Sequence, residues 1–173
     1  SENALFNGLF GLVFWEEIFM PSPGAFVNPF QSAPLDMHSR DFYHRRQTAI
    51  ESRLQQIEAG QAALVILKNF DRYEGVSNRW LNWRWVTREM LELALEHIPP
   101  AALAAVFRRI LFDPKSNRSG MPDLVAFDPE HGYRLIEVKG PGDQLQANQK
   151  RWFRFFLELK IPFEVVWVEW RDD

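Results

Sequence analysis

Two short motifs on either side of a turn constrain this chain more than any other feature. Gly120-Met121-Pro122-Asp123 leads into an apolar run, and Glu137-Val138-Lys139 follows fourteen residues after the aspartate. Residues 124–127 are typical of a short buried strand, residues 128–132 of a turn, and residues 133–139 of a second strand. The segment therefore predicts a β-hairpin.

The predicted hairpin gathers three charged side chains. Because alternate side chains of a strand share one face, we expect Glu137 and Lys139 to point the same way, while Ile136 and Val138 point into the core. The hairpin can then bring Asp123 close to both charged residues. Two carboxylates and an ammonium at one place suit the hydrolysis of a phosphodiester.

A divalent metal ion fits this set of side chains. Magnesium prefers hard oxygen ligands and is usually held by one or two carboxylates, together with substrate phosphate and water. Asp123 and Glu137 supply the carboxylates, and Lys139 would position the attacking water or stabilise the transition state. The metal lowers the pKa of its bound water, and a second ion could steady the leaving oxygen.

The same residues have a plainer interpretation. Glu-Val-Lys on a strand is more often a solvated edge with an ordinary ion pair. Three details favour the site: Pro-Asp opens an apolar strand, the motifs have hairpin spacing, and the glycine-rich Gly140-Pro141-Gly142 follows the lysine. Such a loop keeps bulk away from a place that a phosphate backbone must approach.

Longer stretches of the chain resemble a known family. The resemblance to the VRR-NUC branch of the PD-(D/E)xK nuclease superfamily lies in GMPDLVAF, YRLIEVKGPGDQLQANQKRWF and PFEVVWVEW. The upstream segments are similar to the C-terminal nuclease region of bacterial Fanconi-anaemia-associated nucleases, in ENALFNGLFGLVFWEEIF, PGAFVNPFQSAPLDM and DFYHRRQTAIESRLQQI. The chain also lacks an initiator methionine, so we expect it to be the C-terminal part of a longer protein.

The resemblance implies a metal-dependent, structure-selective DNA nuclease. The implied activity is that of a 5′-flap endonuclease with 5′-to-3′ exonuclease activity, which acts in interstrand crosslink repair. One or two Mg²⁺ or Mn²⁺ ions are the implied cofactors, and branched or flapped DNA is the implied partner. Two alternatives stay open: a Holliday-junction resolvase-like VRR-NUC enzyme and a non-catalytic DNA-binding module. The intact acids favour an enzyme, because a retired site has no physical reason to hold carboxylates together against their repulsion.

The resemblance also assigns roles to particular residues. Asp123, Glu137 and Lys139 fall on the family's catalytic residues, and the Val138 carbonyl falls on a metal ligand. Glu2 falls on the acidic residue that begins the family's first helix and completes the metal site. The alternative for Glu2 is a glutamate that the helix dipole favours in a first turn.

Contacts with DNA are harder to assign. The net charge of −3 argues mildly against DNA binding, because Lys and Arg supply most of the affinity for phosphates. Most basic clusters here are more typical of solvated helix faces. Lys115 and Arg118 are the exception, since they precede the Asp123 strand and the resemblance implies a phosphate-anchoring role near them. Gln149 falls where many PD-(D/E)xK enzymes keep a glutamine near the metal; its alternative is a polar side chain in solvent.

The order of predicted elements indicates the fold class. Helices are expected over residues 3–19, 41–59, 61–73 and 143–160, and a last strand over 163–170. A further helix is expected to run to His97 with Thr87 as its cap, and another to start at Pro99-Pro100 and to carry Ala104 to Leu111. This order predicts an α/β fold with a restriction-endonuclease-like PD-(D/E)xK core of helix, mixed sheet, helix and strand. Residues 1–173 would form one VRR-NUC domain, with a helical insertion from about 36 to 112. In smaller relatives without an insertion the resemblance implies a junction-resolving homodimer, so a monomer is expected here.

Composition excludes several other classes. The chain has no cysteine, so disulfides and thiolate metal sites are ruled out. Its longest apolar run is too short to cross a bilayer, and it has no signal-peptide pattern. A cytoplasmic, nucleoid-associated place in a bacterium is therefore expected. The tryptophans are more typical of packing between helices than of stacking on bases.

Overall fold

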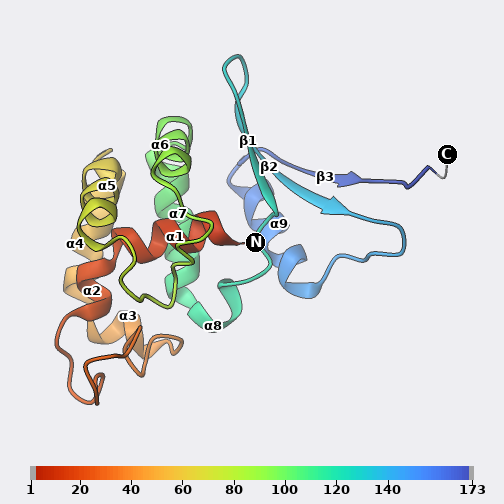
Figure 1. Ribbon diagram of the computed structural model, residues 1–173. Helices are drawn as coiled ribbons and strands as arrows, with labels where there is room; N and C mark the ends of the chain where they lie inside the picture. Colours follow the sequence, from red (N-terminus) through yellow and green to blue (C-terminus); the bar gives the residue numbers. More distant parts are fainter. Residues whose placement is uncertain (1–2, 172–173) are drawn as a thin grey trace.

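The computed structural model describes residues 3–171. Most of its helices precede a small sheet, and Figure 1 shows the sheet and α9 on one side of the molecule with the other helices beside them. The elements are α1 Ala4–Val13, α2 Trp15–Phe19, α3 Asp41–Arg45, α4 Gln47–Glu58, α5 Ala62–Tyr73, α6 Arg88–His97, α7 Pro100–Phe112, α8 Pro114–Asn117, β1 Leu124–Asp128, β2 Gly132–Lys139, α9 Ala147–Glu158 and β3 Phe163–Trp167. Helices α3 to α7 occupy the stretch that the sequence predicts as an insertion.

The sheet confirms the predicted hairpin and the mixed α/β fold. Its strand order is β1-β2-β3. Strands β1 and β2 are antiparallel, with Leu124 opposite Ile136 and Asp128 opposite Gly132. Strand β3 returns through α9 to pair with β2 in parallel, with Glu137 opposite Val165. β2 is therefore the central strand, and its last residues end beside the loop that leads into α9.

The prediction for the faces of β2 was half right. Glu137 and Lys139 do share a face, but both are buried, at 2% and 8% exposure, whereas Val138 is 36% exposed. Ile136 and Val138 thus lie on the outer face, contrary to the expectation that they point into the core. The reason is the position of α9, which covers the Glu137 face and packs on β3 through aromatic pairs such as Phe153–Phe163. Strand β1 is also less buried than predicted.

Several helix limits differ from the predicted ones, and local side-chain contacts accompany the differences. The helix expected over 3–19 breaks at Phe14, and the one expected over 41–59 breaks at Arg46, whose φ is −125°. Arg46 turns inward to donate to both carboxylate oxygens of Asp36, at 2.9 and 3.1 Å, and to the Phe42 carbonyl. Helix α9 starts four residues later than expected because Asp143 instead accepts a hydrogen bond from the Gly140 amide.

Two predicted helix starts are confirmed, whereas the predicted end of the last strand is wrong. The Thr87 hydroxyl accepts a hydrogen bond from the Met90 amide and begins α6, which is the usual role of threonine at an N-cap. Pro100 is the first residue of α7, a position where the missing amide hydrogen costs nothing. The last strand ends at Trp167 and is therefore shorter than the expected strand over 163–170.

Helix α1 forms the centre of the helical part. Leu9, Phe10 and Leu12 are fully buried, and the Phe10 ring lies 4.4 Å from Trp80 and 6.1 Å from Phe107 of α7. This confirms that α1 is too apolar to be a surface helix. Within residues 3–171 no single helix is long and apolar enough to cross a membrane; α6 and α7 meet that test only together, with a bend of 113° between them.

Candidate functional site

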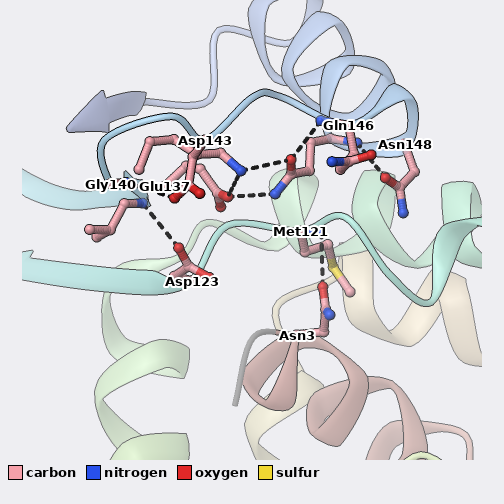
Figure 2. A network of polar contacts seen from close by, with 11 residues as sticks. Asn3, Met121, Asp123, Glu137, Gly140, Asp143, Gln146 and Asn148 are labelled. Atoms are coloured by element: carbon pink, nitrogen blue, oxygen red, sulfur yellow. Dashed lines mark hydrogen bonds and ion pairs between the residues drawn. The ribbon is translucent and has the colours of Figure 1, made fainter. Parts of the chain in front are cut away.

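The hairpin brings Asp123 beside the end of β2. Asp123 immediately precedes β1, and its carboxylate accepts a hydrogen bond of 3.0 Å from the Val138 amide. Figure 2 shows Asp123 and Glu137 on the two arms of the hairpin, with Gln146 at the start of α9 beside them. The predicted meeting of the two motifs is therefore confirmed as geometry.

Glu137 and Lys139 form a buried pair under α9. The Lys139 ammonium lies 3.3 Å from the Glu137 Oε1 atom, and the two side chains are only 10% and 2% exposed. Gln149 of α9 joins them: its amide nitrogen donates to Glu137 Oε1, and its Oε1 atom accepts from Lys139 Nζ at 3.1 Å. Gln149 Oε1 also accepts from the Gln146 amide at 2.8 Å, which ties the site to the start of the helix. Gln149 is thus a member of the cluster and not a solvated helix residue.

The electrostatics of the cluster are strained around Glu137. Burial raises the pKa of the Glu137 carboxyl, the nearby Asp123 carboxylate raises it further, and Lys139 opposes both effects. Within the described part of the chain, the second carboxylate oxygen, Oε2, is buried and has no hydrogen-bond partner. A buried ionised oxygen without a partner is costly. A cation at this place would therefore stabilise the arrangement.

The donor set suits a hard divalent metal. Asp123 and Glu137 line an open, mostly polar hollow of about 460 Å³ together with Lys139, Gln149 and the loop residue Asp143. Carboxylate oxygens are the ligands that Mg²⁺ prefers, and the unpartnered oxygen of Glu137 offers one of them. In residues 3–171 no group of three or more His, Cys, Asp or Glu side chains is placed to hold a metal. A third acid would have to come from elsewhere.

Glu2, the predicted third acid, lies outside the described residues. The neighbouring Asn3 is described, and its side-chain oxygen accepts a hydrogen bond of 2.9 Å from the Met121 amide. Figure 2 shows this contact between the start of α1 and the segment that leads to Asp123. The first helix therefore begins next to the segment that leads to Asp123, although its residues are more than a hundred positions away in the sequence.

The backbone conformation and close packing at Gly120 explain why the first motif begins with glycine. Its φ is +85°, a value that suits glycine because other residues meet a steric penalty there. A Cβ atom at this position would also lie 2.8 Å from the backbone carbon of Asn148 in α9. Two hydrogen bonds to Ser119 hold the two segments together. The Asn148 side-chain amide donates to the Ser119 hydroxyl oxygen at 2.9 Å, and the Trp152 indole donates to the Ser119 carbonyl at 3.0 Å. The segment before Asp123 is therefore fixed to α9.

The two predicted phosphate contacts have different surroundings. Lys115 is exposed on the short helix α8, whereas Arg118 follows that helix and lies 3.2 Å from the His38 Nε2 atom. Burial lowers the pKa of His38 to about 4, with further lowering by the charges of Arg118 and Arg79. Arg118 also lines a second hollow with Arg79 and Arg84.

Arg79 and Arg84 were not predicted as site residues. They stand in a run where arginines are interleaved with Trp80, Trp83 and Trp85, a pattern that favours nucleic-acid binding. The interpretation of the tryptophans as core residues is confirmed for Trp80, which is 5% exposed, but Trp85 is 48% exposed. Arg79 and Arg84 are themselves exposed beside these tryptophans.

Comparisons with known proteins agree with this geometry. The family model described as VRR-NUC domain matches residues 57–170. The chain is similar to a Fanconi-associated nuclease 1 homolog of Pseudomonas aeruginosa, with 45% identity over 99% of this chain and 31% of that protein. It is also similar to Fanconi-associated nuclease 1 of Danio rerio, with 36% identity over 97% of this chain and 18% of that protein.

A solved structure extends the likeness to the fold. The crystal structure described as paFAN1 bound to 1nt 5′flap DNA with gap superimposes with a TM-score of 0.95 and 45% identity, over all of this chain and 32% of that one. A second structure, described as paFAN1 bound to 2nt 5′flap DNA with gap, gives a TM-score of 0.94 and 44% identity, over 99% of this chain and 32% of that one. The described fold is therefore that of a nuclease region. This chain spans about a third of the length of the Pseudomonas aeruginosa relative and of the paFAN1 chains, and about a fifth of the Danio rerio relative.

Proposed function

Because this chain belongs to the VRR-NUC domain family, we propose that it is the nuclease part of a structure-selective DNA nuclease. The observation that carries the proposal is the meeting of Asp123, Glu137 and Lys139 at the end of β2, with a buried Glu137 oxygen that has no partner among residues 3–171. Such a cluster is unfavourable in an idle protein and useful where a metal and a phosphate bind together.

The proposed metal is Mg²⁺ or Mn²⁺, as one or two ions. Asp123 and Glu137 would hold it, and the family resemblance adds the Val138 carbonyl and Glu2 as further ligands. When bound, the metal supplies Lewis acidity, which lowers the pKa of water and neutralises charge on the phosphate.

The protein side chains have separate tasks in the proposed hydrolysis. Water forms a new bond to phosphorus and gives up a proton to bulk water, the bond to the leaving sugar oxygen breaks, and that oxygen takes up a proton from bulk water. The Lys139 ammonium would orient the attacking water or stabilise the negative charge that grows on the phosphate oxygens. Gln149 would hold Glu137 and Lys139 in place, because it bonds to both. Asp143 would keep the following loop in shape through the Gly140 amide.

The proposed substrate is a 5′ flap in duplex DNA, with 5′-to-3′ exonuclease activity and a role in interstrand crosslink repair. The support is the family resemblance and the similarity to structures whose titles describe 5′-flap DNA with a gap. We also propose that helices α3 to α7 are an insertion in the nuclease core, that the chain acts as a monomer, and that it lies with bacterial DNA in the cytoplasm. If the chain is part of a longer protein, an N-terminal region would supply further DNA contacts.

A competition experiment tests the substrate preference. The chain would be incubated with manganese and equal amounts of an end-labelled 5′-flap duplex, a four-way junction and an unbranched duplex of the same sequence. We expect cuts near the base of the flap, at a higher rate than in the other two substrates. Symmetric and preferred cuts in the junction would instead support a resolvase.

Manganese binding separates an enzyme from a binding module. An isothermal titration of Mn²⁺ into the wild-type chain and the Asp123→Ala variant needs no substrate. We expect the variant to lose most of the affinity because half of the described carboxylate pair is missing. DNA binding together with equal manganese affinity in both proteins would support a module without catalysis.

A further inference from the structure

A second hollow lies next to the proposed nuclease site. It has a volume of about 670 Å³, and its lining includes three arginines, Arg79, Arg84 and Arg118, together with the side chains of Asn7 and Ser119. All three arginines are exposed. The hollow thus joins the loop before α6 to the segment that runs from α8 into the catalytic hairpin.

The positive charge of this hollow is not neutralised within the described part of the chain. Over residues 3–171 none of its three arginines has a carboxylate within ion-pair distance, and no acidic side chain lines the hollow. Most other arginines do pair with acids: Arg40, Arg45, Arg46, Arg53, Arg88, Arg108 and Arg134. The partner of Arg118 is His38, which is neutral at pH 7. An anion bound in the hollow would neutralise this charge.

The loop that carries two of the arginines is held in place. The Asn78 side chain is buried; it donates to the Gly11 carbonyl of α1 and accepts from the Trp80 amide at 2.9 Å. Trp80 packs on Phe10. A Cβ atom at Gly11 would lie only 2.8 Å from the Trp80 Cβ atom, so glycine in α1 permits this close contact. Arginines on a fixed loop lose less freedom on binding than arginines on a mobile one.

The hollow is also coupled to the catalytic segment. The Asn7 side chain donates to the Arg118 carbonyl at 2.8 Å. Arg118 and Ser119 directly precede the Gly120 turn that leads to Asp123, and Ser119 is bound to α9 by Asn148. A group bound in the hollow would therefore have a fixed position relative to the hairpin.

We propose that Arg79, Arg84 and Arg118 bind backbone phosphates of the DNA strand that passes the hairpin site. The inference rests on the proposed nuclease function, and it adds Arg79 and Arg84 to the DNA-contacting residues. Guanidinium groups match phosphate oxygens because they can donate two parallel hydrogen bonds. The Ser119 hydroxyl, which also lines the hollow, is a further donor to phosphate or sugar oxygens.

The test is the salt dependence of DNA binding. Affinity for a fluorescent 5′-flap duplex would be measured by anisotropy, without divalent cations so that no cleavage occurs, for wild type and Arg79→Gln/Arg84→Gln. A matched control, Lys68→Gln/Arg72→Gln, removes two exposed charges from α5 that have no ion pair among residues 3–171. Thermal melts would verify that all three proteins fold.

The expected result is specific to the hollow. Each lost phosphate contact flattens the plot of log affinity against log salt by about 0.9 on duplex DNA and about 0.7 on a single strand. The double variant should therefore lose roughly 1.4–1.8 in slope, while the α5 control keeps the wild-type slope. Equal slopes in the two variants would overturn the proposal.

Separate cleavage assays with manganese distinguish this inference from the proposed nuclease function. If the salt slope of the Arg79→Gln/Arg84→Gln variant is flattened but wild type cleaves no DNA, the phosphate-binding proposal is supported and the proposed nuclease function is contradicted. Cleavage by wild type with equal slopes in both variants would contradict the hollow alone. Absence of any flap binding by wild type would overturn both.

Discussion

Glu137 is the residue whose surroundings are best explained by the proposed metal site. It is nearly inaccessible, shares one oxygen between Lys139 and Gln149, and has its other oxygen unpartnered in the described part of the chain. A glutamate chosen for stability alone would be better exposed or fully paired. Its raised pKa follows from the same burial, with Asp123 as a second cause. These surroundings support the proposal that Glu137 binds a cation, at a cost in stability.

Gln149 should act by holding the two charged side chains. In Gln149→Ala, Glu137 and Lys139 lose their common partner, and we expect the single-turnover rate of flap cleavage with manganese to fall by roughly 10–100-fold. Gln55→Ala is the control, because Gln55 is an exposed residue in the last turn of α4. If both variants cleave at the wild-type rate, Gln149 has no positioning role.

His38 predicts how stability depends on pH. Its folded pKa of about 4 lies below the ordinary value of 6.5, so the fold favours the neutral ring. This contribution is present above about pH 6.5 and is lost as the pH falls toward about 4. The wild type should lose on the order of 1–2 kcal/mol more free energy of unfolding across this window than His38→Gln, measured by urea titration.

The control for this measurement is His44→Gln, which removes an exposed histidine from α3. That variant should follow the wild-type curve. An identical fall in stability for His38→Gln and wild type would show that the His38 ring titrates in the folded protein as it does in the unfolded chain.

At the scale of elements, helix α9 organises the site. It covers the Glu137 face of the sheet, supplies Gln149, and holds Ser119 through Asn148 and Trp152. This position also explains why β2 buries its charged residues. A strand whose inner face carries the proposed reaction site does not follow the rule that apolar side chains point inward.

Gly120→Ala tests the contact between α9 and the segment that leads to Asp123. Alanine at a positive φ costs roughly 1–2 kcal/mol, and the clash with Asn148 should add roughly 1–3 kcal/mol and slow cleavage. Gly75→Ala is a close control, because Gly75 has the same φ of +85° but no atom within 4 Å of the added Cβ. The two free energies of unfolding come from urea titrations. Equal losses in both variants would mean that the close approach to α9 is unimportant.

Local signals predicted those elements whose limits depend on near neighbours in sequence. Thr87 and Pro100 mark helix starts, and the spacing of Asp123 and Glu137 gives the hairpin. The break at Arg46 was not predictable in this way, because it depends on the contact with Asp36 across a loop. The burial of Glu137 likewise depends on where α9 packs.

At the scale of the whole molecule, charge distribution matters more than net charge. The chain has a net charge of −3, but several of its acids pair with arginines of the helical part, among them Asp36, Glu17 and Glu51. In the described residues the arginines without carboxylate partners include those of the hollow beside the hairpin. The motifs predicted Asp123, Glu137 and Lys139 as site residues and the resemblance added Gln149, whereas Arg79 and Arg84 become visible only when α1 and the loop before α6 are seen together.

The oligomeric state is a prediction at this scale. If the helices α3 to α7 occupy the face that smaller relatives use for dimers, light scattering at micromolar concentration should give the mass of one chain, 20.4 kDa. A mass of twice that value would contradict the monomer and favour a junction-resolving dimer.

The most direct test of the account is the single-turnover cleavage of an end-labelled 5′-flap duplex with manganese, comparing wild type, Asp123→Ala and Asp128→Asn. Asp128 is a carboxylate at the far end of β1, where it contacts His131, so its variant controls for the loss of charge. We predict that Asp123→Ala falls by at least about 10²-fold, because several kcal/mol of stabilisation at the metal is lost, while Asp128→Asn keeps the wild-type rate. Equal rates in all three proteins, or no manganese-dependent cleavage by wild type, would contradict the assignment of a nuclease site to this hairpin.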